Sequence, residues 1–226
     1  MRCEIRYQPS YSLAVVHLEP GEEVQAEAGA MVSMSSNVEL EAEMKGGFLG
    51  ALGRSVLGGE SFFTSRYQAR GGPGELALAP TLPGDIGYVE LKGETFYLKS
   101  GAYLAADAGL SVDSRWGGAR GFFGSGGLFL LQVKGTGGLL FTSYGALHEK
   151  DLGPGERYRV DTGHVVGFSD GLRFSVQKAG KGWFSTVASG EGLVCEFTGP
   201  GRIYLQTRSE EALVNWMVAR MPSKKD

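Results

Sequence analysis

The side chains of this sequence that could take part in chemistry are few, and His164 is the first to consider. It follows Asp161 by three residues and stands where two internal repeats, described below, have alanine. A histidine near a carboxylate can work as an acid/base group or as a pH-sensitive contact. The alternative is a single histidine that is hydrogen-bonded in a turn or in the core. Asp161 and His164 are therefore candidate binding residues.

The histidines as a set do not predict a metal site. His17, His148 and His164 show neither H-x-H nor H-x-x-x-H spacing and have no cysteine beside them. Sites for zinc and related metals usually show such pairs. We expect no metal and no other cofactor.

One segment, Gly167–Gly171 with the sequence GFSDG, matches the G-x-S-x-G pattern of a serine nucleophile. That pattern works where a strand turns into a helix and lifts the hydroxyl above a sheet. Here the following residues alternate apolar and polar as a strand does, so we expect a hairpin turn instead. The glycine clusters lack the Gly-Lys-Ser/Thr ending of a phosphate loop. The sequence predicts no catalytic residue and favours a protein that is not an enzyme.

The elements that would hold these side chains come from a segment that occurs three times. Each copy begins with Gly-Glu and has a second glycine eight residues later. The copies align without a gap over Gly21–Ala42, Gly93–Ser114 and Gly155–Val176. Apolar and polar residues alternate before and after the second glycine, which is typical of half-buried strands.

From this repeat we predict an all-β fold in one domain, residues 1–226, of the barrel-like or double-stranded β-helix type. The units expected are about 12–80, 81–152 and 153–208. Each would be a β-meander that is too small to bury its apolar face alone. Together they would close into one core with pseudo-threefold symmetry and without exposed sheet edges.

The chain ends in a predicted helix over residues 209–221. Ser209 can cap it, and Glu210 and Glu211 suit the positive end of the helix dipole. The helix then carries an apolar stripe of Leu213, Trp216 and Met217.

The glycine-rich stretch Gly46–Gly59 departs from the strand pattern and places Phe48 and Leu49 near helical spacing. It could be an apolar flap that contacts a protein partner or a membrane surface. The alternative is a loop or one-turn helix that plugs a barrel end or packs in a subunit contact. Phe48 and Leu49 are candidate binding residues on the first interpretation.

Composition restricts the choice of partner and compartment. The net charge is -3, which argues against nucleic acid because its binding needs a clustered basic surface. Cys3 and Cys195 form no disulfide framework, and the chain has neither a signal-peptide pattern nor a long apolar run. We expect a cytoplasmic protein.

Several motifs together resemble a known family. They are LGGESFF at Leu57–Phe63, APTLPGDI at Ala79–Ile86, SGAYLAAD at Ser100–Asp107, VDTGHVVGF at Val160–Phe168 and GEGLVCEFTGPGRIYLQTRS at Gly190–Ser209. The chain is similar to the uncharacterised bacterial proteins related to the mitochondrial-biogenesis protein called altered inheritance of mitochondria, with a fold likened to the tryptophan RNA-binding attenuation protein. The resemblance implies a β-rich, pseudo-threefold barrel that self-associates, and it implies no particular activity.

Three hypotheses for function follow. The preferred one is a non-enzymatic binding or scaffold protein that forms a homo-oligomer and presents apolar loops to a partner. The second is a small-ligand protein or enzyme with a site at the barrel end near His164. The third is RNA binding, which rests on analogy of fold alone.

Overall fold

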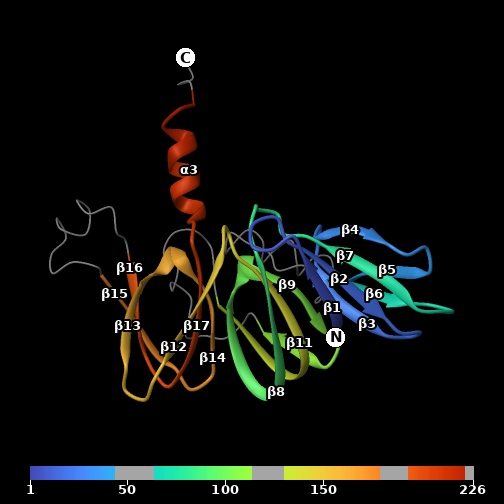
Figure 1. Ribbon diagram of the computed structural model, residues 1–226, viewed down its shortest axis with the longest axis horizontal. Helices are drawn as coiled ribbons and strands as arrows, with labels where there is room; N and C mark the ends of the chain where they lie inside the picture. Colours follow the sequence, from blue (N-terminus) through green and yellow to red (C-terminus); the bar gives the residue numbers. More distant parts are fainter. Residues whose placement is uncertain (44–63, 114–129, 179–192, 222–226) are drawn as a thin grey trace, which may run out of the picture.

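The computed structural model describes residues 1–43, 64–113, 130–178 and 193–221, which form strands almost throughout (Figure 1). Among them is one α-helix, α3 (Glu210–Val218), at the C-terminal end. The prediction of an all-β fold with a short C-terminal helix is confirmed. The strands are β1 (Arg2–Arg6), β2 (Leu13–Leu18), β3 (Glu23–Glu27), β4 (Met31–Met34), β5 (Val38–Glu43), β6 (Thr64–Ala69), β7 (Gly74–Leu78), β8 (Ile86–Lys99), β9 (Tyr103–Asp107), β10 (Leu110–Asp113), β11 (Leu130–Thr142), β12 (Leu147–Leu152), β13 (Arg157–Asp161), β14 (Val165–Ser169), β15 (Arg173–Lys178), β16 (Leu193–Thr198) and β17 (Gly201–Gln206).

The strands form three sheets. The first has the order β1-β2-β7-β4 and the third has the order β13-β16-β15. Between them runs a ten-stranded sheet of order β12-β17-β14-β8-β11-β9-β3-β6-β5, with β10 paired to β11 off this path. Strands β8 and β11 are the longest and pair antiparallel over nearly their whole length. They form the middle of the molecule (Figure 1).

The sheets do not close into a barrel, so that part of the prediction is wrong. The ten-stranded sheet runs from β12 at one edge to β5 at the other. Consecutive strands of a repeat do not form a meander either: β3 pairs with β6 and β9, whereas β4 pairs with β7 in another sheet. The alternation of apolar residues decides which face of a strand is buried but not which strand is its neighbour.

The apolar core consists of three clusters that follow one another along the chain. Tyr67 lies in the first, Phe141 in the second and Phe168 in the third, each almost fully buried. Strand β11 contributes Leu140 to the first cluster, Leu131 to the second and Leu130 to the third. The long strands therefore join the three clusters into one continuous body.

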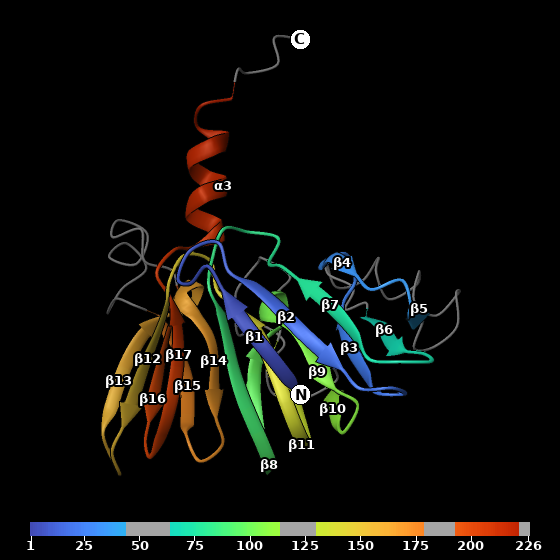
Figure 2. The same ribbon diagram turned by 45° about the vertical axis from the view of Figure 1, so that its right-hand side comes forward.

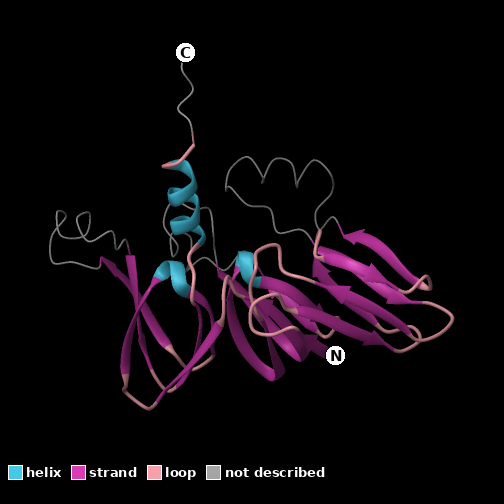
Figure 3. Cartoon of the chain, turned by 45° about the horizontal axis from the view of Figure 1, so that its top comes forward, coloured by secondary structure: helices cyan, strands magenta, loops and turns pink. Residues whose placement is uncertain are grey.

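Helix α3 extends away from the sheets, and two views agree on this (Figures 1 and 2). Two short 3-10 helices, η1 (Ser100–Ala102) and η3 (Thr162–His164), lie on the same side of the sheets as its base (Figure 3). They stand at the second glycine of the second and third repeats, where the chain bends from one strand to the next. In the described part of the chain, no helix has the length and apolar character that crossing a membrane requires.

Candidate functional site

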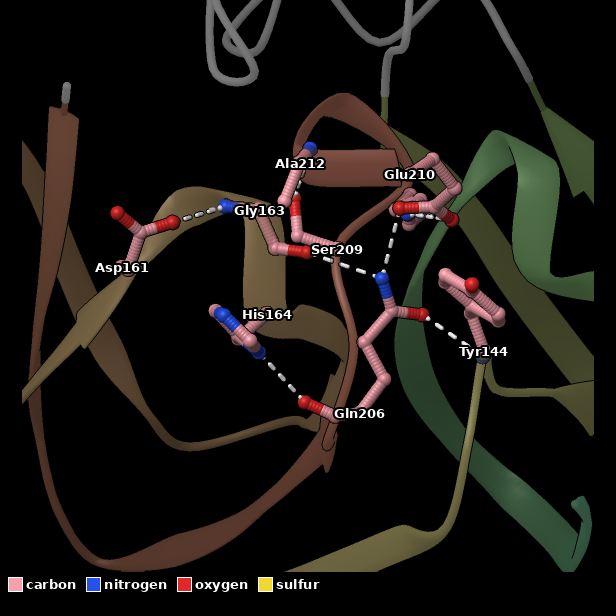
Figure 4. A network of polar contacts seen from close by, with 9 residues as sticks. Tyr144, Asp161, Gly163, His164, Gln206, Ser209, Glu210 and Ala212 are labelled. Carbon is pink, nitrogen blue, oxygen red and sulfur yellow. Dashed lines mark hydrogen bonds and ion pairs between the residues drawn. The ribbon is translucent and has the colours of Figure 1, made fainter. Parts of the chain in front are cut away.

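The candidate residues Asp161 and His164 lie at the two ends of the η3 turn, between β13 and β14 (Figure 4). The Asp161 carboxylate accepts a hydrogen bond from the Gly163 backbone N at 2.7 Å and so caps the turn. The His164 Nδ1 lies 2.7 Å from the Gln206 carbonyl oxygen. Each side chain therefore has a structural partner of its own, and these contacts do not join the two into an acid/base pair.

Gln206, the last residue of β17, is the centre of the polar network around this turn. Its buried side-chain Nε2 donates to the Gly163 carbonyl at 2.9 Å and to Glu210 Oε2 at 2.8 Å. Its Oε1 accepts from the Tyr144 backbone N at 3.1 Å (Figure 4). Both amide hydrogens and the amide oxygen have partners, as expected of a buried polar group.

A buried ammonium group completes the network from the other side. Lys99 ends β8 and is almost fully buried, and its Nζ lies 2.7 Å from Glu210 Oε1. A buried charge without a partner is costly, so the ion pair holds Glu210 in place. Glu210 thus contacts Lys99 through one carboxylate oxygen and Gln206 through the other.

The start of α3 is fixed by the same residues. Ser209 caps the helix as predicted, since its Oγ accepts from the Ala212 backbone N. The turn at Gly163 approaches this cap so closely that a Cβ atom there would lie 3.2 Å from Ser209 Oγ. These contacts anchor the first turn of α3 to η3, β8 and β17. The hydrogen-bond donors and acceptors of the network are paired with each other.

Beyond its anchored base, α3 exposes apolar side chains. Of the residues that the structure describes in this helix, none is buried. We define the apolar helix face by its exposed side chains Val214, Trp216, Met217 and Val218 together with Met221 just beyond the helix. At 3.6 residues per turn these lie on one broad side, and Asn215 and Ala219 lie on the other. Trp216 is 56% exposed and Met221 is 69% exposed.

The remaining sequence candidates are Phe48, Leu49 and the serine of the G-x-S-x-G segment. Phe48 and Leu49, with the stretch Gly46–Gly59, lie outside the described residues. Ser169 of the G-x-S-x-G segment ends β14, and its Oγ accepts from the Arg202 backbone N at 2.8 Å. A turn and strand β15 follow, so the setting is not that of a nucleophile, although β14 and β15 do not pair as a hairpin. Among the described residues no group of three or more His, Cys, Asp or Glu side chains could hold a metal ion.

Sequence reasoning missed Lys99, Tyr144, Gln206 and Glu210 as parts of one network. Lys99 could have been noticed, because it is a basic residue where the aligned positions of the other two repeats hold the carboxylates Glu27 and Asp161. Gln206 ends an apolar strand directly before the helix cap, which is also unusual for a polar residue. Glu210 is only four positions from Gln206, but the other contacts of this network join residues 43 to 111 positions apart, which local patterns do not reveal.

The fold and site define a protein of open, layered β-sheets with an anchored and exposed C-terminal helix. The family model described as mitochondrial biogenesis AIM24 matches residues 3–208, and the chain belongs to this family. The resemblance inferred from the sequence motifs is therefore confirmed at the level of the family.

Two proteins from Streptococcus pyogenes are similar to this chain over nearly its whole length. The chain is 33% identical to an uncharacterised protein of the serotype M6 strain, over 99% of this chain and 92% of that protein. It also matches the X-ray crystal structure of another S. pyogenes protein with a TM-score of 0.80 and 32% sequence identity. That match covers 97% of this chain and 99% of the other.

Proposed function

We propose that the protein is a non-enzymatic binding or scaffold protein that self-associates, and that α3 is the element through which two copies meet. The observation that carries this proposal is the apolar helix face on an anchored helix. Exposed apolar surface of this kind, rimmed by polar residues, is characteristic of interaction sites.

The energetics of α3 support a covered state. The helix has nine residues, and helices this short are marginal in water unless an apolar face packs against something. In one copy alone, the described residues cover little of it, since Trp216 and Val218 are more than half exposed. A partner that covers this face would add the packing that the sheets do not provide.

The charges at the two ends of α3 favour the α3 helix of a second copy as the partner that covers the apolar helix face. The first turn carries Glu211, and Arg220 follows the last turn. An antiparallel pair would place Glu211 of one copy near Arg220 of the other and would bring Trp216 and Met217 of both copies to the centre. Arg220 already lies over the Trp216 ring at 4.3 Å, which holds the ring at this surface. Such a contact is two-fold and self-complementary.

The contacts at the base of α3 support a non-enzymatic role. His164, Asp161 and Lys99 each have a structural partner, and the network uses its own donors and acceptors. The second hypothesis, a ligand site near His164, has no comparable observation in its favour.

We also propose that the three units are related by pseudo-threefold symmetry. As the compartment of the protein we propose the cytoplasm. The order β2-β7-β4 in the first unit and β12-β17-β14 in the third supports the former. The cysteines Cys3 and Cys195 are both free, which suits a reducing compartment. The likeness to the tryptophan RNA-binding attenuation protein stays a prediction about fold.

The test measures the mass of the assembly, and so its number of subunits, by native mass spectrometry and light scattering over a range of protein concentrations. The variant Trp216→Ser/Met217→Ser removes the centre of the apolar helix face. Because one such central residue can contribute about 2 kcal/mol, we expect at least about a thirtyfold rise in the dissociation constant. The control Asn215→Ser/Ala219→Ser changes the opposite side of the same helix and should keep the wild-type mass.

Two results would contradict the proposal: a monomeric wild type, or an unchanged mass for the Trp216/Met217 variant. Flotation of a monomeric wild type with vesicles of phosphatidylcholine and phosphatidylglycerol would show that lipid covers the helix instead. Circular dichroism of each variant separates loss of contact from loss of fold.

A further inference from the structure

The outward face of the first unit, strands β3, β6 and β5, is acidic around one arginine. We call this the acidic face, with Glu23, Glu27, Glu39 and Glu41 around Arg66. Arg66 of the central strand pairs in register with Gln25 on one side and Glu41 on the other. Residues directly opposite in a sheet point to the same side, so these charges share one surface. Glu39 and Glu41 are exposed, and Arg70 at the strand end lies 3.1 Å from Glu39.

The outward face of the third unit, strands β13, β16 and β15, has the opposite pattern. We call this the basic face, with Arg157, Arg159 and Arg173 around Glu196. Glu196 of the central strand pairs in register with Arg159 and Ser175. Both Arg157 and Arg159 donate to its carboxylate, and the Arg159 Nε distance is 2.7 Å. Asp161 ends the row, where its carboxylate caps the η3 turn.

The two faces carry opposite charges at two aligned outer positions, whereas the aligned Glu27 and Asp161 have the same sign. The ungapped repeat matches Glu23 with Arg157, Gln25 with Arg159 and Glu39 with Arg173. The central residues of the two sheets, Arg66 and Glu196, occupy the same place in the register and are reversed as well.

The middle unit shows that this pattern is not a general property of the repeat. The positions aligned with Glu23, Gln25 and Glu39 are the uncharged Thr95, Tyr97 and Ser111, and the central residue that pairs with Tyr97 is Gln132. The positions aligned with Glu27 and Glu41 are Lys99 and Asp113. The central position therefore reads Arg66, Gln132 and Glu196 along the chain. Opposite charge is concentrated in the first and third units, which lie at opposite ends of the long axis of the molecule (Figures 1 and 2).

We infer that the acidic face of one copy binds the basic face of the next copy in a head-to-tail contact. Two similar strand frameworks of opposite charge are complementary to each other, and their positions at the two ends prevent one chain from joining its own faces. A contact between two different faces is heterologous and continues into a ring or a filament. The inference rests on the proposed self-association and adds a second contact, distinct from α3.

Such a contact depends mainly on electrostatics. Exposed ion pairs contribute about 0–1 kcal/mol each, so the charges select the partner and its orientation more than they supply affinity. Because the Debye length shortens from about 10 Å at 0.1 M salt to about 3 Å at 1 M, the head-to-tail contact should weaken as salt rises. The apolar α3 contact should not weaken in this way.

The test uses two charge-reversed variants of the full chain. Glu39→Arg/Glu41→Arg makes both ends basic, and Arg157→Glu/Arg173→Glu makes both ends acidic. Each alone should show at least about a tenfold weaker head-to-tail association, because like charges then face each other. An equimolar mixture of the two should recover high-mass assemblies, since a basic end then meets an acidic end. Analytical ultracentrifugation at low and high salt measures all three samples.

The outcomes separate this inference from the proposed function. A wild type that is monomeric at all concentrations overturns both. A wild type that assembles, with charge-reversed variants that keep its mass or a mixture that restores nothing, overturns the head-to-tail contact alone. If circular dichroism shows that a reversed variant does not fold, Glu39→Gln/Glu41→Gln and Arg157→Gln/Arg173→Gln replace the pair, and each must then weaken association for the inference to stand.

Discussion

Helix α3 and the sheets of this protein use apolar side chains in opposite ways. In the sheets, residues such as Phe168 and Tyr67 are almost fully buried in clusters that join neighbouring strands. In α3, Trp216 and Val218 project from the body and are more than half exposed. Burial in the sheets stabilises the fold of one chain, whereas the exposed side chains of α3 become useful only when something covers them. The same residue types therefore serve folding in one region and association in the other.

The largest effect should come from truncating an aromatic residue in the sheets. Phe168 is fully buried and packs against Tyr97, Phe174 and Phe197 with ring centroids 5.0 to 5.2 Å away. Phe168→Ala should lower the free energy of unfolding by about 3–5 kcal/mol, because it removes this packing and leaves a cavity. Urea unfolding followed by circular dichroism measures the change. A loss below about 1 kcal/mol would mean that the third cluster can collapse around the gap.

A smaller effect is expected where the two regions join. Glu210→Gln leaves the buried Lys99 ammonium without its carboxylate, at a site where Glu210 itself is about one-third exposed. The free energy of unfolding should fall by about 1–3 kcal/mol, a value between those for exposed and for buried ion pairs. This loss of stability should be concentrated in α3. Hydrogen exchange should show faster exchange in α3 with little change in β8.

Glu211→Gln is the matched control for this prediction. Glu211 is the neighbouring exposed carboxylate. Its replacement should leave the stability within about 0.5 kcal/mol of the wild type. Equal effects of the two substitutions would contradict an anchoring role for the Lys99–Glu210 pair.

The third unit also predicts a pH dependence. The pKa of the Glu196 carboxyl lies below its usual value because Arg159 and Arg157 donate hydrogen bonds to it. The pKa is lower in the folded than in the unfolded state, where it is about 4.3, so these contacts stabilise the fold above that pH. Their contribution is lost as the pH falls through the lower, folded-state pKa. Arg159→Gln should therefore raise the pKa of Glu196, as NMR titration of its side chain can measure, and Arg173→Gln should change it less.

The smallest effect on stability is expected for the exposed aromatic residue. Trp216→Ser should change the free energy of unfolding of the separate chain by about 0.5 kcal/mol or less, because this side chain buries little surface there. Urea unfolding at a concentration where the protein is monomeric checks this. Taken with Phe168→Ala, this result would sharpen the contrast between a side chain that supports folding and one that supports association. A loss comparable to that of Phe168→Ala would show that α3 packs on its own chain.

Part of the site could be predicted from local sequence, and part could not. Ser209 was predicted to cap the helix and does so, because capping involves only the next three residues. The helix was predicted to end at residue 221 but ends at Val218. The sequence left open whether His164 and Asp161 act together or are held separately in a turn or in the core, and it did not indicate their partners Gln206 and Gly163.

The sequence by itself determined the all-β class, the alternation of apolar and polar residues along the repeats and the helix cap, because each depends on residues that are close along the chain. It did not determine which strands pair, that β4 enters a different sheet from β3, or that the sheets stay open. Only the tertiary structure brought Lys99 to Glu210 and placed Arg66 and Glu196 at the centres of two faces of opposite charge. The physical reason is that a period of two specifies a face but no partner, and partners are chosen by packing between segments that are distant in sequence.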